Sequence, residues 1–354
     1  MDFCYKFPVV KGIQAKKQYY IAMVPLKMLG KLFPDEEELL PEYRAQRRLN
    51  ESRIPVISRY ILENRDSYVF SALAASIDGN FEFVQSDKEN LGVLEVALDA
   101  RFLINDGQHR KAAILQALEE SPELGEETIS VVFYEDLGLE NSQQMFTDLN
   151  KHAVKTSNSI AELYDSRDNL AVATREMVAK IAFFDNYVDK EKDILGKYSS
   201  SLFTLNNIYT ANKRMLSKSR CDETFEKFCF QYWSEICRNM VPWIELQEKR
   251  ISKQELREKY IAAQAVVIQA FGRTGGYIYR SQDNIEQHVQ KIQGIDWRRK
   301  AQCWYLRVIK ENGRMINSER AIMLASNVIK KQMEIELTEE EQLAENQFNK
   351  ANRK

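Results

Sequence analysis

The sequence predicts an α+β protein, with a small mixed sheet and helices in the N-terminal half and an all-α C-terminal half. Apolar and polar residues alternate over several short segments, and this strand pattern stops after Tyr134. From about residue 157 the apolar residues follow helical spacing instead. A chain of 354 residues is long enough for two cores. We therefore expect two domains, 1–156 and 157–354, the second ending in a polar tail.

The individual elements follow from these patterns and from turn residues. Five of the seven prolines lie in the first 55 residues and separate short elements there. Asp78-Gly79-Asn80 is typical of a hairpin turn. The predicted strands are 19–24, 68–73, 81–84, 93–96, 102–104 and 129–134, and the predicted helices are 159–184, 224–248, 253–271 and 318–336.

The last two segments of interest lie in the helical half. Thr338-x-x-Glu341 predicts a capping box that begins one more short helix, after which the polar C-terminus is expected to fray. The glycine-rich residues 271–277 are typical of a helix stop and turn. An anion-binding loop is the alternative there, because consecutive glycines expose backbone N–H groups.

Composition limits the classes of function. No stretch approaches ~18 apolar residues and no secretory signal is visible, so we expect a cytoplasmic protein without membrane contact. The five cysteines form no C-x-x-C pair, so we expect reduced thiols and no structural metal. The formal net charge is −2, so any contact with nucleic acid must come from local basic patches.

One stretch, Asp106-Gly107-Gln108-His109-Arg110, carries residue types that suit ligand chemistry. It lies between an apolar strand pattern and a helical pattern, so it is a predicted strand-to-helix turn. Glycine allows a positive φ and a close approach to the backbone, and the following helix N-terminus attracts anions. The histidine and arginine add donors, so a phosphate site is predicted. A structural glycine turn, with both side chains paired to a carboxylate, fits the pattern equally well.

This pentapeptide is the signature of the DGQHR-domain family, which the chain resembles. Residues 146–150 are similar to the family's F-x-D-x-N segment, and residues 7–25 to its first strand pair. The family includes the DndB proteins of bacterial DNA sulfur modification, or phosphorothioation. The resemblance implies a DNA-binding transcriptional repressor of the sulfur-modification genes.

The same turn resembles more distant groups, the ParB partition proteins and the sulfiredoxins, which share one fold. Gln108 stands where sulfiredoxins have their cysteine, so thiolate chemistry is excluded here. The resemblance implies a nucleotide site for ATP or CTP with Mg²⁺, formed by residues 106–110. By the same resemblance, Asp148 and Asn150 would hold the metal through hard oxygen ligands, although the arginine that follows in ParB is missing.

Clusters of arginine are the candidate contacts to DNA phosphates. Two of them are Arg44, Arg47, Arg48 and Arg53 in one segment and Arg298, Arg299 and Lys300 in another. A solvated protein face is the more frequent explanation of such runs. The expected partners are double-stranded DNA, other sulfur-modification proteins and a second copy of the chain.

Two functions therefore compete. The first is a DNA-binding regulator that uses nucleotide as a switch. The second is an ATPase or other nucleotide hydrolase that assists DNA modification, whose catalytic residues the sequence does not identify. We expect the regulator, because a conformational switch requires nucleotide binding without turnover.

Overall fold

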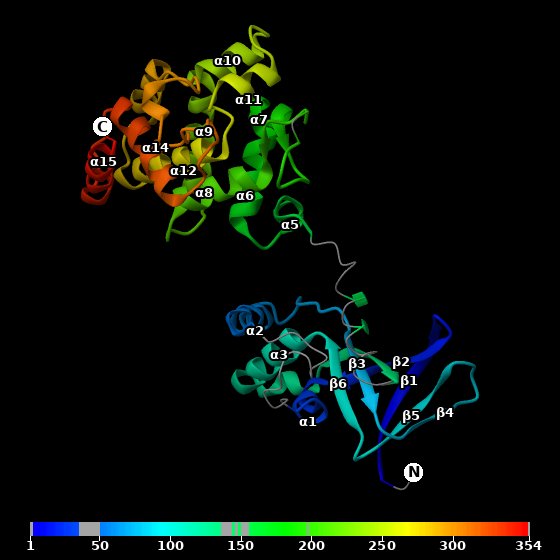
Figure 1. Ribbon diagram of the computed structural model, residues 1–354. Helices are drawn as coiled ribbons and strands as arrows, with labels where there is room; N and C mark the ends of the chain where they lie inside the picture. Colours follow the sequence, from blue (N-terminus) through cyan, green and yellow to red (C-terminus); the bar gives the residue numbers. More distant parts are fainter. Residues whose placement is uncertain are drawn as a thin grey trace. The chain divides into compact units, whose positions relative to one another are not determined.

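The computed structural model describes residues 3–34, 50–135, 144–145, 148–149, 156–196 and 198–352. The chain divides into two compact units, Met1–Val154 and Lys155–Lys354, each with its own hydrophobic core. Figure 1 shows strands and helices in the first unit and mostly helices in the second.

Seven strands of the N-terminal unit form one mixed sheet in the order β4-β5-β1-β2-β7-β3-β6. Neighbouring strands pair antiparallel except β3 and β7, which are parallel. The predicted mixed sheet is therefore confirmed. The strands are β1 (Cys4–Gln14), β2 (Lys17–Pro25), β3 (Leu73–Asp78), β4 (Phe81–Gln85), β5 (Leu91–Ala97), β6 (Arg101–Asp106) and β7 (Thr128–Glu135).

Strands β3 to β6 form one long hairpin, and the sheet bends where each arm of this hairpin passes from one strand to the next. β3 continues into β4 and β5 into β6, yet β3 pairs only with β6 and β7, and β4 only with β5. The predicted hairpin turn at Asp78-Gly79-Asn80 is therefore wrong, because this segment is a bend between strands that do not pair. Gly79 has φ +137°, and a Cβ there would lie 2.8 Å from Cα of Ala100, so the bend requires glycine.

The predicted strand over 68–73 is also wrong, because β3 begins only at Leu73. The two aromatic residues before it have tertiary partners instead. The phenol of Tyr68 donates to Glu127, and the ring of Phe70 lies 6.0 Å from that of Tyr60 in α2. Side-chain packing thus decides where pairing with β7 begins.

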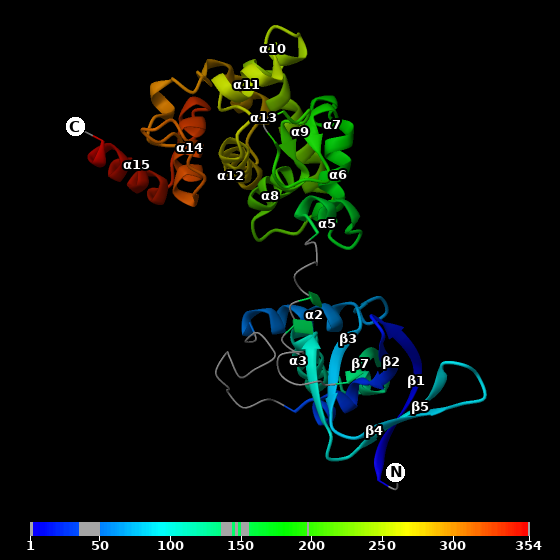
Figure 2. The same ribbon diagram turned by 45° about the vertical axis from the view of Figure 1, so that its right-hand side comes forward.

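Three helices of this unit lie together on one side of the strands, away from the β4–β5 hairpin (Figures 1 and 2). They are α1 (Leu29–Leu32), α2 (Ile54–Glu63) and α3 (Gln108–Glu120), with short 3₁₀ turns at Leu26–Met28, Glu51–Arg53 and Pro122–Glu126. Ile61 of α2 and Ile114 and Ala117 of α3 are buried in one core with Leu73. The helices therefore fix the position of the chain before β3.

The C-terminal unit is mostly helical, as predicted. Its strands within the described residues are only Val188–Asp189 and Phe203–Thr204. The helices are α5 (Asn158–Tyr164), α6 (Asn169–Lys180), α7 (Ala182–Tyr187), α8 (Leu205–Leu216), α9 (Glu223–Asn239), α10 (Val241–Gln247), α11 (Lys253–Lys259), α12 (Ala265–Ser281), α13 (Ile285–Val289), α14 (Glu319–Gln332) and α15 (Glu339–Ala351).

Several predicted helix boundaries are wrong. The stretch 159–184 is divided into three helices, because the Asp168 carboxylate caps a new helix by accepting from the N–H groups of Leu170 and Ala171. Likewise, the stretch 253–271 is interrupted, since α11 ends at Lys259 and α12 begins at Ala265. None of the helices in the described part of the chain is both long and apolar enough to cross a membrane.

The glycine-rich stretch 271–277 is neither a stop nor an anion loop. It lies inside α12, and its glycines let α12 cross α8 at close range. A Cβ on Gly272 would be 2.3 Å from the carbonyl oxygen of Ala211, and one on Gly276 would be 2.9 Å from that of Met215. The glycines are there for helix packing.

The C-terminal segment does not fray as predicted, because α15 continues to Ala351 and is held by buried ion pairs. Lys330 of α14 lies 2.7 Å from Glu341, and both side chains are 2% exposed. Arg307 binds both carboxylate oxygens of Glu345, at 2.5 and 2.9 Å. The helix is polar because it docks through charges rather than through an apolar face.

We expect Gly272→Ala to lower the stability of the C-terminal unit. The added methyl group forces α8 and α12 apart, and such overpacking costs about 1–3 kcal/mol, more than the ~1 kcal/mol gained in helix propensity. Calorimetric unfolding measures the difference. The control is Gly196→Ala, because nothing lies within 4 Å of that added methyl group. Equal losses in both variants would contradict the close helix crossing.

We expect Glu345→Gln to destabilise the docking of α15 by about 3 kcal/mol, because it leaves the Arg307 guanidinium without its counter-ion. Burial raises the pKa of Glu345, but the hydrogen bonds from Arg307, Lys331 and Asn327 outweigh it and leave this pKa lowered. The stabilisation is therefore present above about pH 5 and is lost as the pH falls through the lowered pKa. Urea unfolding at several pH values measures this stabilisation.

Glu340→Gln is the control, since Glu340 on the same helix is 73% exposed. If the difference in free energy of unfolding between the variant and wild type did not shrink in acid, the ion pair with Arg307 would not be its origin.

Candidate functional site at the DGQHR turn

The strand-to-helix turn is formed as predicted, between the end of β6 at Asp106 and the start of α3 at Gln108. Gly107 has φ +105°, and a Cβ there would lie 2.3 Å from Cδ2 of Leu73, so any other residue would be strained at this position. No side chain in the described part of the chain caps this helix. The first N–H groups of α3 and the positive end of its dipole lie at this turn, an arrangement that favours anions.

Arg110 ties the turn to the chain that enters β3. Its guanidinium donates to the carbonyl oxygens of Ser71 at 2.6 Å and Ala72 at 2.8 Å, and to Oδ2 of Asp106 at 2.6 Å. Its side chain is only 17% exposed. The structural role weighed from the sequence is thus present for Arg110, and it orients the loop around the turn.

His109 connects the turn to the segment that leads into α2. Its Nε2 accepts a hydrogen bond of 2.9 Å from the backbone N–H of Asn50. The side chain of Asn50 in turn accepts from Ser52 and caps the 3₁₀ turn Glu51–Arg53. These two hydrogen bonds connect the turn at Gly107 to the 3₁₀ turn that precedes α2.

A cavity of about 490 Å³ opens at the turn, a volume typical of small-ligand sites. Asp106, Gly107, His109 and Arg110 line it, whereas Gln108 does not. The opposite wall comes from the start of α2 and from the chain before β3. It consists of Arg53, Val56, Ile57, Tyr60 and Phe70. Arg53 is exposed, and it adds a cation to an aromatic wall.

Sequence analysis missed Arg53, Tyr60 and Phe70 as members of this site. They are more than 35 residues away along the chain and carry no motif of their own. Only the packing of α2 against α3 brings them to the turn, together with the bonds from Arg110 to Ser71 and Ala72.

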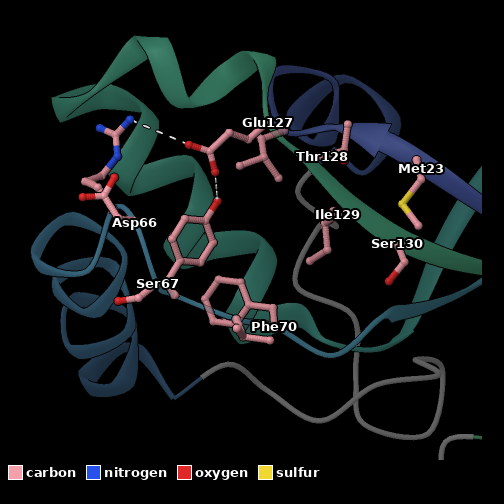
Figure 3. A pocket seen from close by; sticks show the side chains of 12 residues that line it. Met23, Asp66, Ser67, Phe70, Glu127, Thr128, Ile129 and Ser130 are labelled. Carbon is pink, nitrogen blue, oxygen red and sulfur yellow. Dashed lines mark hydrogen bonds and ion pairs between the residues drawn. The ribbon is translucent and has the colours of Figure 1, made fainter. Parts of the chain in front are cut away.

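A neighbouring cavity of about 420 Å³ shares Phe70 with the first but has different chemistry (Figure 3). Its charged lining consists of two carboxylates, Asp66 and Glu127, and one guanidinium, that of Arg65. Arg65 lies 3.8 Å from Glu127, which also accepts from the phenol of Tyr68. Burial and this hydrogen bond raise the pKa of Tyr68. The two carboxylates make this cavity unsuitable for phosphate.

The predicted metal ligands are only partly described. Asp148 is exposed, lies beside a separate cavity of about 710 Å³ and accepts from Nε2 of Gln144 at 2.7 Å. Asn150 lies outside the described residues. Among those that the structure describes, no three His, Cys, Asp or Glu side chains are grouped as a metal site.

Only some of the predicted DNA contacts, among them the second group in the C-terminal unit, lie within the described residues. Arg44, Arg47 and Arg48 lie outside the described residues. In the C-terminal unit, Arg298 forms an ion pair of 2.5 Å with Asp296. Arg299 donates to the carbonyl oxygen of Arg257 at 3.2 Å.

Comparison with known proteins gives one match, which spans both units. The family model described as DndB, DNA-sulfur modification-associated, matches residues 7–336. No curated protein and no solved structure matches the chain, so the more distant likeness to ParB and sulfiredoxins remains a prediction. The resemblance seen at the DGQHR turn is confirmed for the family. The chain belongs to the DndB family of DNA-sulfur modification-associated proteins.

Proposed function

We propose that this protein is a DNA-binding regulator of a DNA sulfur modification system and that the DGQHR turn binds the nucleotide that switches it. The geometry of the turn carries the nucleotide part of the proposal. The N-terminus of α3, which no described side chain caps, lies at one cavity together with a glycine of positive φ and the side chains of Arg53 and His109. These are the features by which backbone and side chains bind phosphate.

The aromatic wall supports a nucleotide over a bare phosphate. Tyr60 and Phe70 line the same cavity as the turn. Aromatic rings offer a face on which a nucleobase stacks, and such stacking is worth about 1–3 kcal/mol per base. A phosphate at the helix N-terminus and a base on the aromatic wall would together fill the cavity.

The contacts around the turn also support a switch. His109 accepts from Asn50, and Asn50 follows the basic segment that contains Arg44, Arg47 and Arg48. A ligand that draws the imidazole toward itself competes with this hydrogen bond. In this proposal, binding at the turn changes the DNA affinity of that segment, and linkage requires DNA to change nucleotide affinity by the same factor.

We expect Arg53→Gln to weaken ATP or CTP binding about tenfold or more, because a hydrogen bond from a charged donor contributes ~1.5–3 kcal/mol. Isothermal titration with and without Mg²⁺ measures this. Arg59→Gln is the matched control, since Arg59 is an exposed arginine that does not line the cavity. Arg110 is unsuitable for this test, because its loss leaves the bonded carbonyls and Asp106 without a partner. If wild type binds neither nucleotide, the turn is structural.

Phosphate release measured on the same preparation distinguishes the regulator from the hydrolase. We expect bound nucleotide to remain intact and the affinity for DNA to change when nucleotide is added. Steady turnover that depends on Arg53 would support the hydrolase instead.

For DNA, we expect binding to a specific duplex upstream of sulfur-modification genes, with Arg47 contributing a phosphate contact. Arg47→Ala should flatten the slope of log affinity against log salt by about 0.9 without changing sequence preference. Mobility shifts over a salt series measure both quantities. Lys180→Ala serves as the control, because Lys180 is an exposed cation paired with Glu176. Equal affinity for the operator and a scrambled duplex would argue against repression.

A further inference from the structure

A cavity of about 480 Å³ in the C-terminal unit has an excess of positive charge. It lies between the end of α11 and the loop 296–301. Its charged lining consists of Lys259, Arg298, Arg299 and Lys300 on one hand and of Glu258 and Asp296 on the other. The wall therefore attracts anions even though the chain as a whole is slightly acidic.

The walls of this cavity are held rigidly by backbone bonds. The N–H of Arg299 donates to the carbonyl oxygen of Lys259 at 2.8 Å, and that of Ile261 donates to the carbonyl oxygen of Trp297 at 2.9 Å. Trp297 is 2% exposed and stacks on Trp304 with ring centroids 5.4 Å apart. The basic loop is thus anchored in the core and is preorganised for a ligand.

Two of the four cations already have counter-ions. Arg298 binds Asp296 through Nε at 2.8 Å and Nη2 at 2.5 Å. Lys259 forms an ion pair of 2.8 Å with Glu255. These two side chains are therefore largely neutralised.

Arg299 differs from both, because it has no carboxylate partner among the residues that the structure describes. Its Nη2 donates to the carbonyl oxygen of Arg257 at 3.2 Å, while its Nε is buried without any hydrogen-bond acceptor. Burial lowers the pKa of this guanidinium, so its charged form is destabilised where it stands. A partly buried cation that lacks a counter-ion among the described residues is stabilised by an anion that binds beside it.

We propose that this cavity is a phosphate-binding site in which Arg299 holds the phosphate oxygens and Lys300 adds charge at the mouth. A guanidinium matches phosphate geometry through two parallel hydrogen bonds. Lys300 is exposed and forms no ion pair with any described residue. The phosphate belongs either to a DNA backbone or to a free phosphorylated ligand. The first case rests on the proposed DNA-binding function, whereas the site itself does not.

The site is tested by titrating the full chain with inorganic phosphate at constant ionic strength. The fluorescence of the neighbouring tryptophans reports the binding. We expect wild-type binding, a loss of about tenfold or more in Arg299→Gln and partial retention in Arg299→Lys. Arg314→Gln is the matched control, because Arg314 is exposed and does not line the cavity. Absence of wild-type binding, or equal binding by Arg299→Gln, would overturn the proposal.

Lys300→Gln keeps the test decisive if Arg299→Gln does not fold, since the Lys300 side chain is exposed. We expect this variant to fold normally and to bind phosphate two- to threefold more weakly. This change corresponds to a loss of ~0.4–0.7 kcal/mol in binding free energy. Unchanged affinity in this variant together with unchanged affinity in Arg299→Lys would overturn the site.

Salt series with duplex DNA identify the source of the phosphate. A slope flattened by about 0.9 in Arg299→Gln assigns the site to the DNA backbone. An unchanged slope with phosphate binding lost assigns it to a free phosphorylated ligand. If wild type binds phosphate but no duplex, the proposed DNA-binding function fails while the site stands.

Discussion

The hydrogen bonds of the Arg110 guanidinium are the interaction on which the N-terminal unit depends most. They join the DGQHR turn to Ser71 and Ala72, the two residues just before β3. Since β3 lies between β6 and β7, the same bonds align the turn with the parallel pair in the sheet. The arginine of the motif thus fixes the architecture, and Arg53 and His109 line the cavity beside it.

The two units place positive charge beside a cavity in different ways. In the N-terminal unit, the charge is the end of a helix dipole exposed by a glycine turn. In the C-terminal unit, it is the guanidinium of Arg299, held between α11 and a loop anchored by Trp297 and Trp304. Both devices suit phosphate, which agrees with membership of a family associated with DNA sulfur modification.

Charge also determines how the C-terminal helix docks. α15 buries Glu341 and Glu345 against Lys330 and Arg307, so its inward face is anionic and its sequence is polar. Hydrophobic patterning cannot detect such a helix, because the stabilisation comes from paired ions instead of apolar area. The same reasoning explains why the capping box at Thr338 was recognised while the length of the helix was not.

The sequence by itself determined the fold class, most strands, the helical second half, the turn at Gly107 and the family, because these follow from local periodicity and a short motif. Tertiary structure alone decided where β3 begins, how Gly79 bends the sheet and why Gly272 lies inside a helix, since each depends on what packs against that residue. It also decided the site, because Arg53, Tyr60 and Phe70 reach the turn only through helix packing. Likewise, Arg298 and Arg299 are neighbours of equal charge in the sequence. Only the fold gives Arg298 a carboxylate partner and leaves Arg299 without one among the residues that the structure describes.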